Sequence, residues 1–135
     1  MIIEKTYDFD NVPTDDKHFL TIRDYHRTII NDIIKESYKI KMSNNFKNVV
    51  IFTGFNGYVM IQDSANFFVN SISSVAITNQ IQHLGSLMGN EVYYDTRLES
   101  NKIVIGESIS DVSYYIITKG RKEKLLKIEN ESNTN

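Results

Sequence analysis

The sequence predicts an α+β fold, in which one long amphipathic helix packs on a small mixed sheet beside a short second helix. Three patterns indicate this fold. Apolar residues recur at three- and four-residue steps from Phe19 to Tyr38, a continuous apolar run follows at 49–52, and further apolar runs lie close together between residues 87 and 117. A chain of 135 residues fits one such domain, which we expect over residues 19–120.

The first 18 residues begin with a short apolar piece and then become polar. Four aspartates and the only proline of the chain lie here, and this composition favours a turn or an arm over a packed element. The aspartates lack the ligand spacing, turn glycine and bidentate glutamate of a calcium loop. Residues 1–18 are therefore predicted to form an N-terminal arm.

The long helix is predicted to begin at Phe19 and to end near Ser43-Asn44-Asn45, where short polar side chains compete for backbone hydrogen bonds. Val49-Val50-Ile51-Phe52 is apolar without alternation, which predicts a strand buried on both faces. Residues 54–62 supply one apolar side and predict the short helix. The apolar side of the long helix consists of Phe19, Ile22, Tyr25, Ile29, Ile30, Ile33, Ile34 and Tyr38.

The second half of the chain predicts an excursion, a hairpin and two strands. Residues 63–82 are rich in Ser, Asn, Gln and Thr but include several apolar residues, so we expect an extended loop that packs on something. A hairpin with its tight turn at Gly89-Asn90 follows. Residues 102–105 and 112–117 predict two strands, and residues 121–135 predict a disordered polar tail.

Composition argues against several functions. The net charge of −2, from 15 basic and 17 acidic residues, leaves no broad electrostatic footprint for nucleic acid or an anionic membrane. The absence of cysteine removes disulfides, thiolate metal sites and thiol nucleophiles. No apolar run reaches the length of about 18 residues that a membrane helix needs, and the N-terminus does not resemble a signal peptide.

No catalytic, cofactor-binding or metal site is predicted. His18, His26 and His83 lack the spacing of metal ligands. The segment 85–89 has two glycines but lacks the lysine and hydroxyl residues of a phosphate-binding loop. Four tyrosines on predicted strands, Tyr93, Tyr94, Tyr114 and Tyr115, have the ring chemistry to stack on bases, but aromatic packing between strands is the commoner role. Nucleic acid is therefore not an expected partner.

A polar turn with opposite charges connects two of the predicted strands. It carries Asp95, Arg97 and Glu99. Two interpretations remain open, a solvated loop or a contact with a neighbouring subunit, where charges set register and specificity. Together with Phe67 and Phe68 of the excursion, these three residues are the predicted subunit-interface residues.

The order of the motifs resembles one known family. The long helix leads into Asn45–Thr53, which is similar to a family strand of pattern N-[FW]-[IV]-[IV]-x-S, and 57–61 takes the place of a short helix. A G-x-L-x-G-x-x-V-Y-x-D hairpin follows in the family, and then a V-x-[IV]-G motif before another strand. Here the matching residues are Gly85, Leu87, Gly89, Val92, Tyr93, Asp95, Val104, Ile105 and Gly106. Over residues 19–119 the chain resembles the axial domain of tailed-phage major capsid proteins, the Hong-Kong-97-like fold of the myovirus type.

The resemblance implies a structural viral protein. Complete shell proteins of this family also have an extended gripping loop and a peripheral sheet. With 18 residues before the helix and about 15 after the last predicted strand, we expect the gripping loop and most of the peripheral domain to be absent from this sequence. The chain is therefore expected to be a reduced capsid-like domain, made in the host cytoplasm and located in the virion as a minor, vertex or auxiliary component of the phage head. Its expected partners are other capsid subunits or copies of itself, and it needs no cofactor.

Two alternatives remain. The first is a small phage or host regulator that binds another protein. The second is a small α+β enzyme or nucleotide-binding protein whose site is assembled from residues that the sequence does not pair. Fold alone does not decide between these functions.

Overall fold

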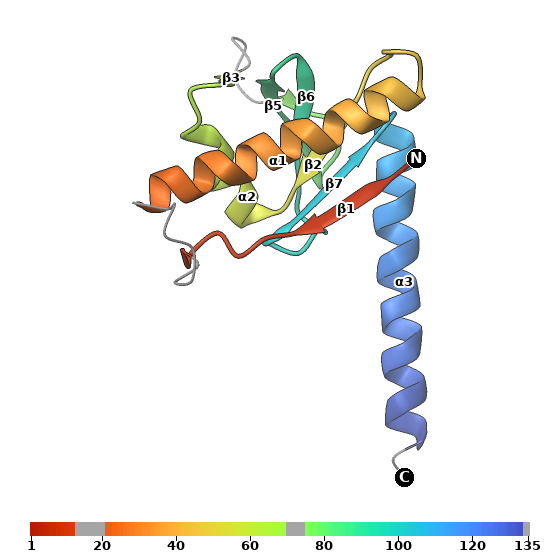
Figure 1. Cartoon of the computed structure of the whole chain (residues 1–135). Helices are drawn as coiled ribbons and strands as arrows, with labels where there is room; N and C mark the ends of the chain where they lie inside the picture. Colours follow the sequence, from red (N-terminus) through yellow and green to blue (C-terminus); the bar gives the residue numbers. More distant parts are fainter. Residues whose placement is uncertain (13–20, 70–74, 134–135) are drawn as a thin grey trace.

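The computed structural model describes residues 1–12, 21–69 and 75–133. One mixed sheet lies between two helical layers, with α1 and α2 on one face and the beginning of α3 on the other (Figure 1). The α+β prediction is confirmed. The elements are β1 (Ile3–Thr6), α1 (Ile22–Ser43), β2 (Val50–Thr53), α2 (Phe55–Gln62), β3 (Phe67–Val69), β4 (Val75–Ala76), β5 (Ile81–Leu87), β6 (Asn90–Asp95), β7 (Lys102–Gly106) and α3 (Ile109–Asn133).

β2 is the central strand of the sheet, whose order is β1-β7-β2-β6-β5-β3, with β4 also paired to β5. It runs parallel to β6 and antiparallel to β7. All four of its residues are buried, as the apolar run predicted. Since alternate side chains of a strand point to opposite faces, Ile51 packs under α1 while Val50 and Phe52 pack against α3.

The middle of α1 follows the predicted apolar spacing, whereas Ile22 and Tyr38, which were predicted on its apolar side, are 42% and 53% exposed. The side chain of Thr21 accepts a hydrogen bond from the backbone N–H of Asp24 at 3.1 Å and so caps the first turn. The helix ends at Ser43, where the sequence predicted its end, and Asn45 and Phe46 then adopt positive φ values of 60° and 62°. The residues that α1 buries in the core include Ile29, Ile30, Ile33 and Ile40.

The β5–β6 hairpin confirms the predicted turn, shifted by one residue. Leu87 pairs with Asn90, so the two loop residues are Met88 and Gly89. Both have positive φ, 50° and 82°, which is the conformation of the tight turns that suit the twist of hairpins. Gly89 adopts this conformation without steric cost.

The connection from β6 to β7 passes over the end of β2, because β2 lies between these two strands. It also covers the beginning of α2. The backbone N–H of Gly54 donates to the carbonyl of Lys102 at 3.0 Å, and that of Asn56 donates to the carbonyl of Ser100 at 2.9 Å. Backbone groups at a helix start otherwise lack partners, so this connection stabilises α2 in place of a side-chain cap.

The prediction of a strand at 112–117, and with it the prediction of a single long helix, is wrong. These residues lie in α3. Just before this helix, Oγ of Ser108 accepts a hydrogen bond from the backbone N–H of Asp111 at 3.1 Å and so caps the first turn. Val112 and Ile116 are buried one turn apart, whereas Tyr114 between them is exposed, as the helical period requires. A short apolar run fits either element, and contact with the sheet selected the helix.

The short apolar piece at the start of the predicted arm is a strand, as its strand-like pattern indicated, whereas the C-terminal segment differs from the predicted tail. Residues 3–6 form the edge strand β1, which pairs antiparallel with β7. α3 continues to Asn133 and extends away from the sheet (Figure 1), through the segment predicted as a polar tail. The predicted excursion contains β3 and β4, both antiparallel to β5, and its residues 70–74 lie outside the described part of the chain. No helix among the described residues is long and apolar enough to cross a membrane.

We expect Phe52→Ala to lower the free energy of unfolding by about 3–5 kcal/mol, because the substitution opens a cavity at a fully buried position of the central strand. Phe55→Ala is the matched control, since this side chain is 54% exposed and its loss costs less than about 1 kcal/mol. Urea unfolding followed by circular dichroism measures both. Equal effects of the two substitutions would contradict the placement of β2.

Candidate interaction surface

Asp95 and Arg97, two of the predicted interface residues, form an internal ion pair. The Arg97 guanidinium donates from Nε to Oδ1 of Asp95 at 3.0 Å and from Nη2 to Oδ2 at 2.7 Å. The backbone N–H of Arg97 also donates to Oδ1, at 2.9 Å. The hydrogen bonds to Asp95 raise the pKa of Arg97 above its ordinary value. This carboxylate is fully buried and has ordered donors on both oxygens.

The same arginine ties the β6–β7 connection to α3. Its Nη2 donates to Oγ of Ser113 at 3.1 Å. The ion pair therefore holds the connection against the first turns of the helix. The prediction that Asp95 and Arg97 face a neighbouring subunit is not supported, because the buried carboxylate already uses the arginine inside the domain.

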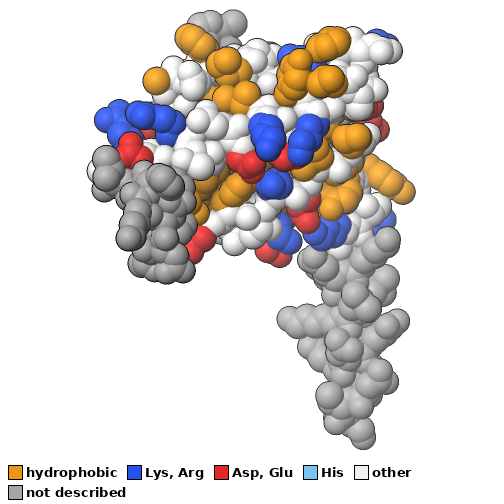
Figure 2. Space-filling view, in the orientation of Figure 1, with side chains coloured by type: hydrophobic (Ala, Val, Ile, Leu, Met, Phe, Trp, Pro, Cys, Tyr) orange, Lys and Arg blue, Asp and Glu red, His pale blue; other side chains and the backbone are white. Residues whose placement is uncertain are grey.

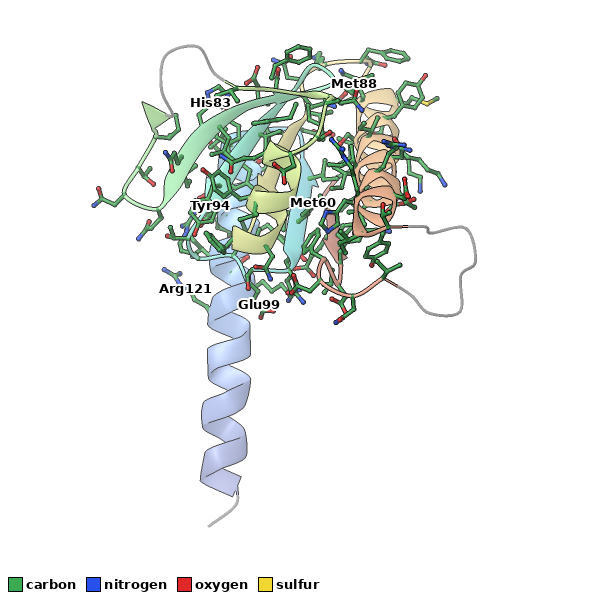
Figure 3. The ribbon with its side chains drawn as sticks, turned by 90° about the vertical axis from the view of Figure 1, so that its left-hand side faces the viewer. Met60, His83, Met88, Tyr94, Glu99 and Arg121 are labelled. Atoms are coloured by element: carbon green, nitrogen blue, oxygen red, sulfur yellow. The ribbon has the colours of Figure 1, made fainter. Side chains whose placement is uncertain are left out.

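Glu99, the third charged residue of the turn, lies at the surface (Figure 3). Its side chain is 62% exposed, and its Oε2 is 3.5 Å from Nζ of Lys102. An exposed pair of this kind contributes little to stability. Glu99 therefore remains a candidate for contact with a partner.

The two phenylalanines of β3 have opposite environments. Phe67 is 9% exposed and belongs to the core under α1, so it is not an interface residue. Phe68 and Val69 are 68% and 70% exposed. The sequence identified Phe68 correctly as an apolar residue at the surface but missed Val69. Only the alternation of faces along β3, once its pairing with β5 is known, separates Phe67 from Phe68.

Other exposed apolar side chains gather in small groups, and Figure 2 shows several on one face of the molecule. The ring of Tyr38 on α1 lies 6.3 Å from that of Phe46. On α2, the ring centroid of Phe55 lies 6.4 Å from that of Tyr94 on β6, and the ring centroid of Tyr58 lies 5.4 Å from that of Tyr94. Such groups mark sites of protein contact more often than isolated exposed residues do. Tyr94 packs against α2 rather than against an aromatic residue of a neighbouring strand.

A cavity of about 600 Å³ lies between α1 and the end of α2. Arg23, His26 and Arg27 line it from α1, and Met60, which lies between the two helices in Figure 3, lines it from α2. Nε2 of His26 is 2.7 Å from the carbonyl oxygen of Phe9. The cavity has the size of a small-molecule site. Its lining carries both positive and negative charges, because Asp63 lies there beside the two arginines.

A second cavity of about 640 Å³ has an acidic lining that includes Asp8, Asp10 and Glu99. Among the described residues, no three His, Asp or Glu side chains converge in the way that a metal site requires. His83 pairs instead with Glu91 on the adjacent strand, Nε2 to Oε2 at 2.5 Å, and its ring contacts that of Tyr93 in a tilted arrangement, with the ring centroids 5.0 Å apart. His18 lies outside the described residues.

Tyr7 fastens the end of β1 to α1. Its hydroxyl donates to Oδ2 of Asp32 at 2.6 Å, and Nζ of Lys5 lies 3.4 Å from the same oxygen. Burial, together with the bond to Asp32, raises the pKa of Tyr7 far above its ordinary value. Partial burial opposes ionisation of Asp32, but the bond from Tyr7 and the charge of Lys5 prevail and lower its pKa. Sequence reasoning missed this contact, because its partners are 25 residues apart.

Comparisons of the chain with protein-family models, with curated proteins and with solved structures gave no match. The candidate surface therefore rests on its own geometry. It consists of Phe68 and Val69 on β3, the exposed Glu99, and the aromatic group of α2, which is Phe55 and Tyr58.

We expect Arg97→Met to lower the free energy of unfolding by about 3–5 kcal/mol, because it leaves the buried carboxylate of Asp95 without its counter-charge. Glu99→Gln, which breaks only the exposed pair of the same turn, is expected to cost less than about 1 kcal/mol. Urea unfolding measures both values. An Arg97→Met protein of unchanged stability would restore this arginine as a candidate for partner contact.

We expect Tyr7→Phe to destabilise the protein by about 1–2 kcal/mol near neutral pH, because it removes a hydrogen bond to a carboxylate. The lowered pKa of Asp32 stabilises the fold above about pH 4, and this stabilisation is lost as the pH falls further. The raised pKa of Tyr7 stabilises the folded protein below about pH 10, and this stabilisation is lost as the pH rises further. The difference in stability between wild type and Tyr7→Phe should therefore become smaller at both low and high pH.

Thermal unfolding between pH 3 and pH 11 measures this difference, with Tyr38→Phe at an exposed site as the control. A difference that is constant over the whole range would show that Tyr7 acts by packing alone.

Proposed function

We propose that this chain is a structural protein of a phage head, a reduced capsid-like domain that acts through protein–protein contacts as a minor, vertex or auxiliary component. Its proposed partners are other capsid subunits or copies of itself, and its proposed location is the virion. Association is its whole chemistry, so no catalytic step is assigned to it.

The observation that carries this proposal is the place of the motif glycines in the fold. Gly89 occupies a positive-φ position of the hairpin turn. A Cβ at Gly85 would lie 2.1 Å from the carbonyl oxygen of Phe68, so only glycine allows β3 to approach β5 at this point. The G-x-L-x-G pattern thus corresponds to requirements of this hairpin. The resemblance to the capsid family therefore involves residues on which this part of the fold depends.

The order of elements is a second support. α1 leads into the buried strand β2, α2 follows at once, and the hairpin and β7 complete the sheet. This is the order in which the resembling motifs occur along the capsid family up to β7, after which the family has another strand and this chain has α3. β7 ends at Gly106, the last residue of the V-x-[IV]-G motif.

The exposed apolar side chains suit association with other proteins. Phe68 and Val69 on β3 and Phe55 on α2 are each more than half exposed. Apolar anchors inside a polar rim are the usual means of contact between subunits. In an assembly, several weak contacts of this kind add up through multivalency.

The nucleotide-binding alternative is favoured by one feature, the cavity that Arg23 and Arg27 line from the same side of α1. A phosphate group is the natural partner of two neighbouring guanidinium groups. Thermal unfolding in the presence of millimolar ATP or GTP would reveal such binding, because a ligand that binds only the folded protein raises its melting temperature. Arg27→Gln should abolish the shift if this alternative is right.

The proposed function is tested by asking whether the chain stays with phage heads. We expect mass spectrometry of density-purified particles from the source of this sequence to find the chain, and high-salt washing to leave it in place. Light scattering and electron microscopy of the purified protein, alone and mixed with these particles, then show whether it docks on them. A chain present only in the soluble fraction of the lysate would favour the regulator, which binds a partner without entering the virion.

A further inference from the structure

The second half of α1 and the turn after it expose lysines and aromatic rings on one surface. The helical members of this surface recur at three- and four-residue steps, so they lie on the same side of α1. Figure 2, which views the molecule from the side of α1, shows Lys and Arg side chains and hydrophobic side chains along this helix. The surface, named here the basic–aromatic patch, consists of the exposed residues Lys35, Tyr38, Lys39, Met42, Phe46 and Lys47.

The acidic residues of α1 have partners of their own. Asp24 lies in the first turn of the helix, far from the patch along the helix axis. Asp32 pairs with Lys5 of β1. Glu36 is buried, and its Oε1 lies 3.0 Å from Nζ of Lys39. The exposed surface of the patch therefore contains no carboxylate.

The positive charge of the patch is only partly balanced. In the described part of the chain, neither Lys35 nor Lys47 forms an ion pair. The patch is therefore a local concentration of positive charge, although the net charge of the whole chain is −2. Net charge is an average over the surface, so it does not exclude a local site for phosphate groups.

The two aromatic rings of the patch have faces open to a ligand. Tyr38 and Phe46 are 53% and 64% exposed, and their rings meet edge-on with the planes at 62°. A contact of this kind leaves at least one face of each ring uncovered by the other. Such faces can stack on a further planar group.

Phe46 is held outward in an unusual backbone conformation. Its φ is 62°, a value that a bulky residue adopts only at an energetic cost. Its backbone N–H donates to the carbonyl oxygen of Lys41 at 2.6 Å, which fixes the turn to the end of α1. Conformations of this kind occur most often at ligand-binding and switch sites.

We propose that the basic–aromatic patch binds single-stranded nucleic acid, with its lysines on phosphate groups and the rings of Tyr38 and Phe46 stacked on bases. Cations that follow the backbone, combined with exposed rings, are the usual means of binding single strands without sequence preference. The bases of a single strand are free to leave the stack, whereas those of a duplex present only their edges. The argument uses α1 and its turn alone, so it does not rest on the proposed function.

Two other kinds of partner fit this patch less well. An amphipathic helix that lies on a membrane buries its apolar side in the lipid, but the apolar side of α1, with Ile29, Ile33 and Ile40, lies in the core. Contacts between proteins contain fewer lysines than the rest of the surface does. Lysine is instead a common partner of the phosphate backbone.

Fluorescence anisotropy of labelled oligo(dT) and oligo(U), each of about 20 nucleotides, tests the proposal with the full chain. Each phosphate contact on a single strand contributes about −0.7 to the slope of log K against log salt, so three lysines predict a slope of about −2. The double variant Lys35→Gln/Lys47→Gln should reduce this slope to about −0.7 and weaken binding at least about tenfold at low salt. Arg121→Gln, which removes an exposed charge from α3 (Figure 3), should leave both values unchanged.

Phe46→Gly tests the rings separately from the charges. Glycine adopts positive φ without steric cost, so urea unfolding should find this variant at least as stable as the wild type. Its affinity for the strand should fall at least about fivefold, while the salt slope stays the same. Tyr114→Ala removes a 72% exposed ring from α3 and should bind like the wild type. Tyr38→Ala serves as the second variant if Phe46→Gly fails to fold by circular dichroism.

Several results would overturn the proposal. These are a strand that does not bind at low salt, a duplex that binds as tightly as the single strand, and ring variants that fold and bind with wild-type affinity. Cosedimentation with phosphatidylserine vesicles is the competing measurement, and a protein that prefers the vesicles to the strand would show a membrane surface instead. A chain that stays with phage heads but binds no strand would overturn only this inference and leave the proposed function standing.

Discussion

The complete burial of β2 is the constraint on which the rest of this structure depends. A strand with both faces and both edges covered requires a neighbour on each side and a helical layer above and below it. β6 and β7 supply the neighbours, α1 with α2 covers one face, and α3 covers the other. Because α3 covers its face only with its first turns, the far part of that helix extends from the body of the domain (Figure 1).

The insertion of β2 between β6 and β7 explains the polar contacts that the β6–β7 connection makes with both helical layers. The chain must pass over the end of β2 to reach β7, and a connection at that place crosses the start of α2. The carbonyl of Ser100 accepts hydrogen bonds there from α2, while Asp95 and Arg97 hold the connection to Ser113 of α3. One short segment thereby joins the sheet to both helical layers. Its charges serve the fold, which leaves Glu99 as the exposed charged residue of the former interface prediction.

The surfaces that remain available are then set by what the fold leaves uncovered. The edge at β1 is occupied by ion pairs to two helices, whereas β3 at the opposite edge presents the exposed apolar side chains of Phe68 and Val69. Together with the aromatic group of α2, this edge is the part of the molecule best suited to contact with other proteins. A role in association, as proposed from the resemblance to capsid proteins, uses these surfaces without demanding a catalytic site.

Residue spacing alone determined those parts of the protein whose structure depends on neighbours in sequence. The ends of α1, the burial of β2, the short α2 and the hairpin follow from apolar periodicity, polar helix ends and a glycine turn, which act within a few residues. The order of the strands, the helical state of 112–117 and the opposite environments of Phe67 and Phe68 were decided by tertiary structure. Each depends on which face a distant element covers, and the burial of Asp95 likewise depends on a helix that follows it in the chain. Local patterns carry no information about such contacts, because the free energy that selects them arises only when the sheet and its two helical layers pack together.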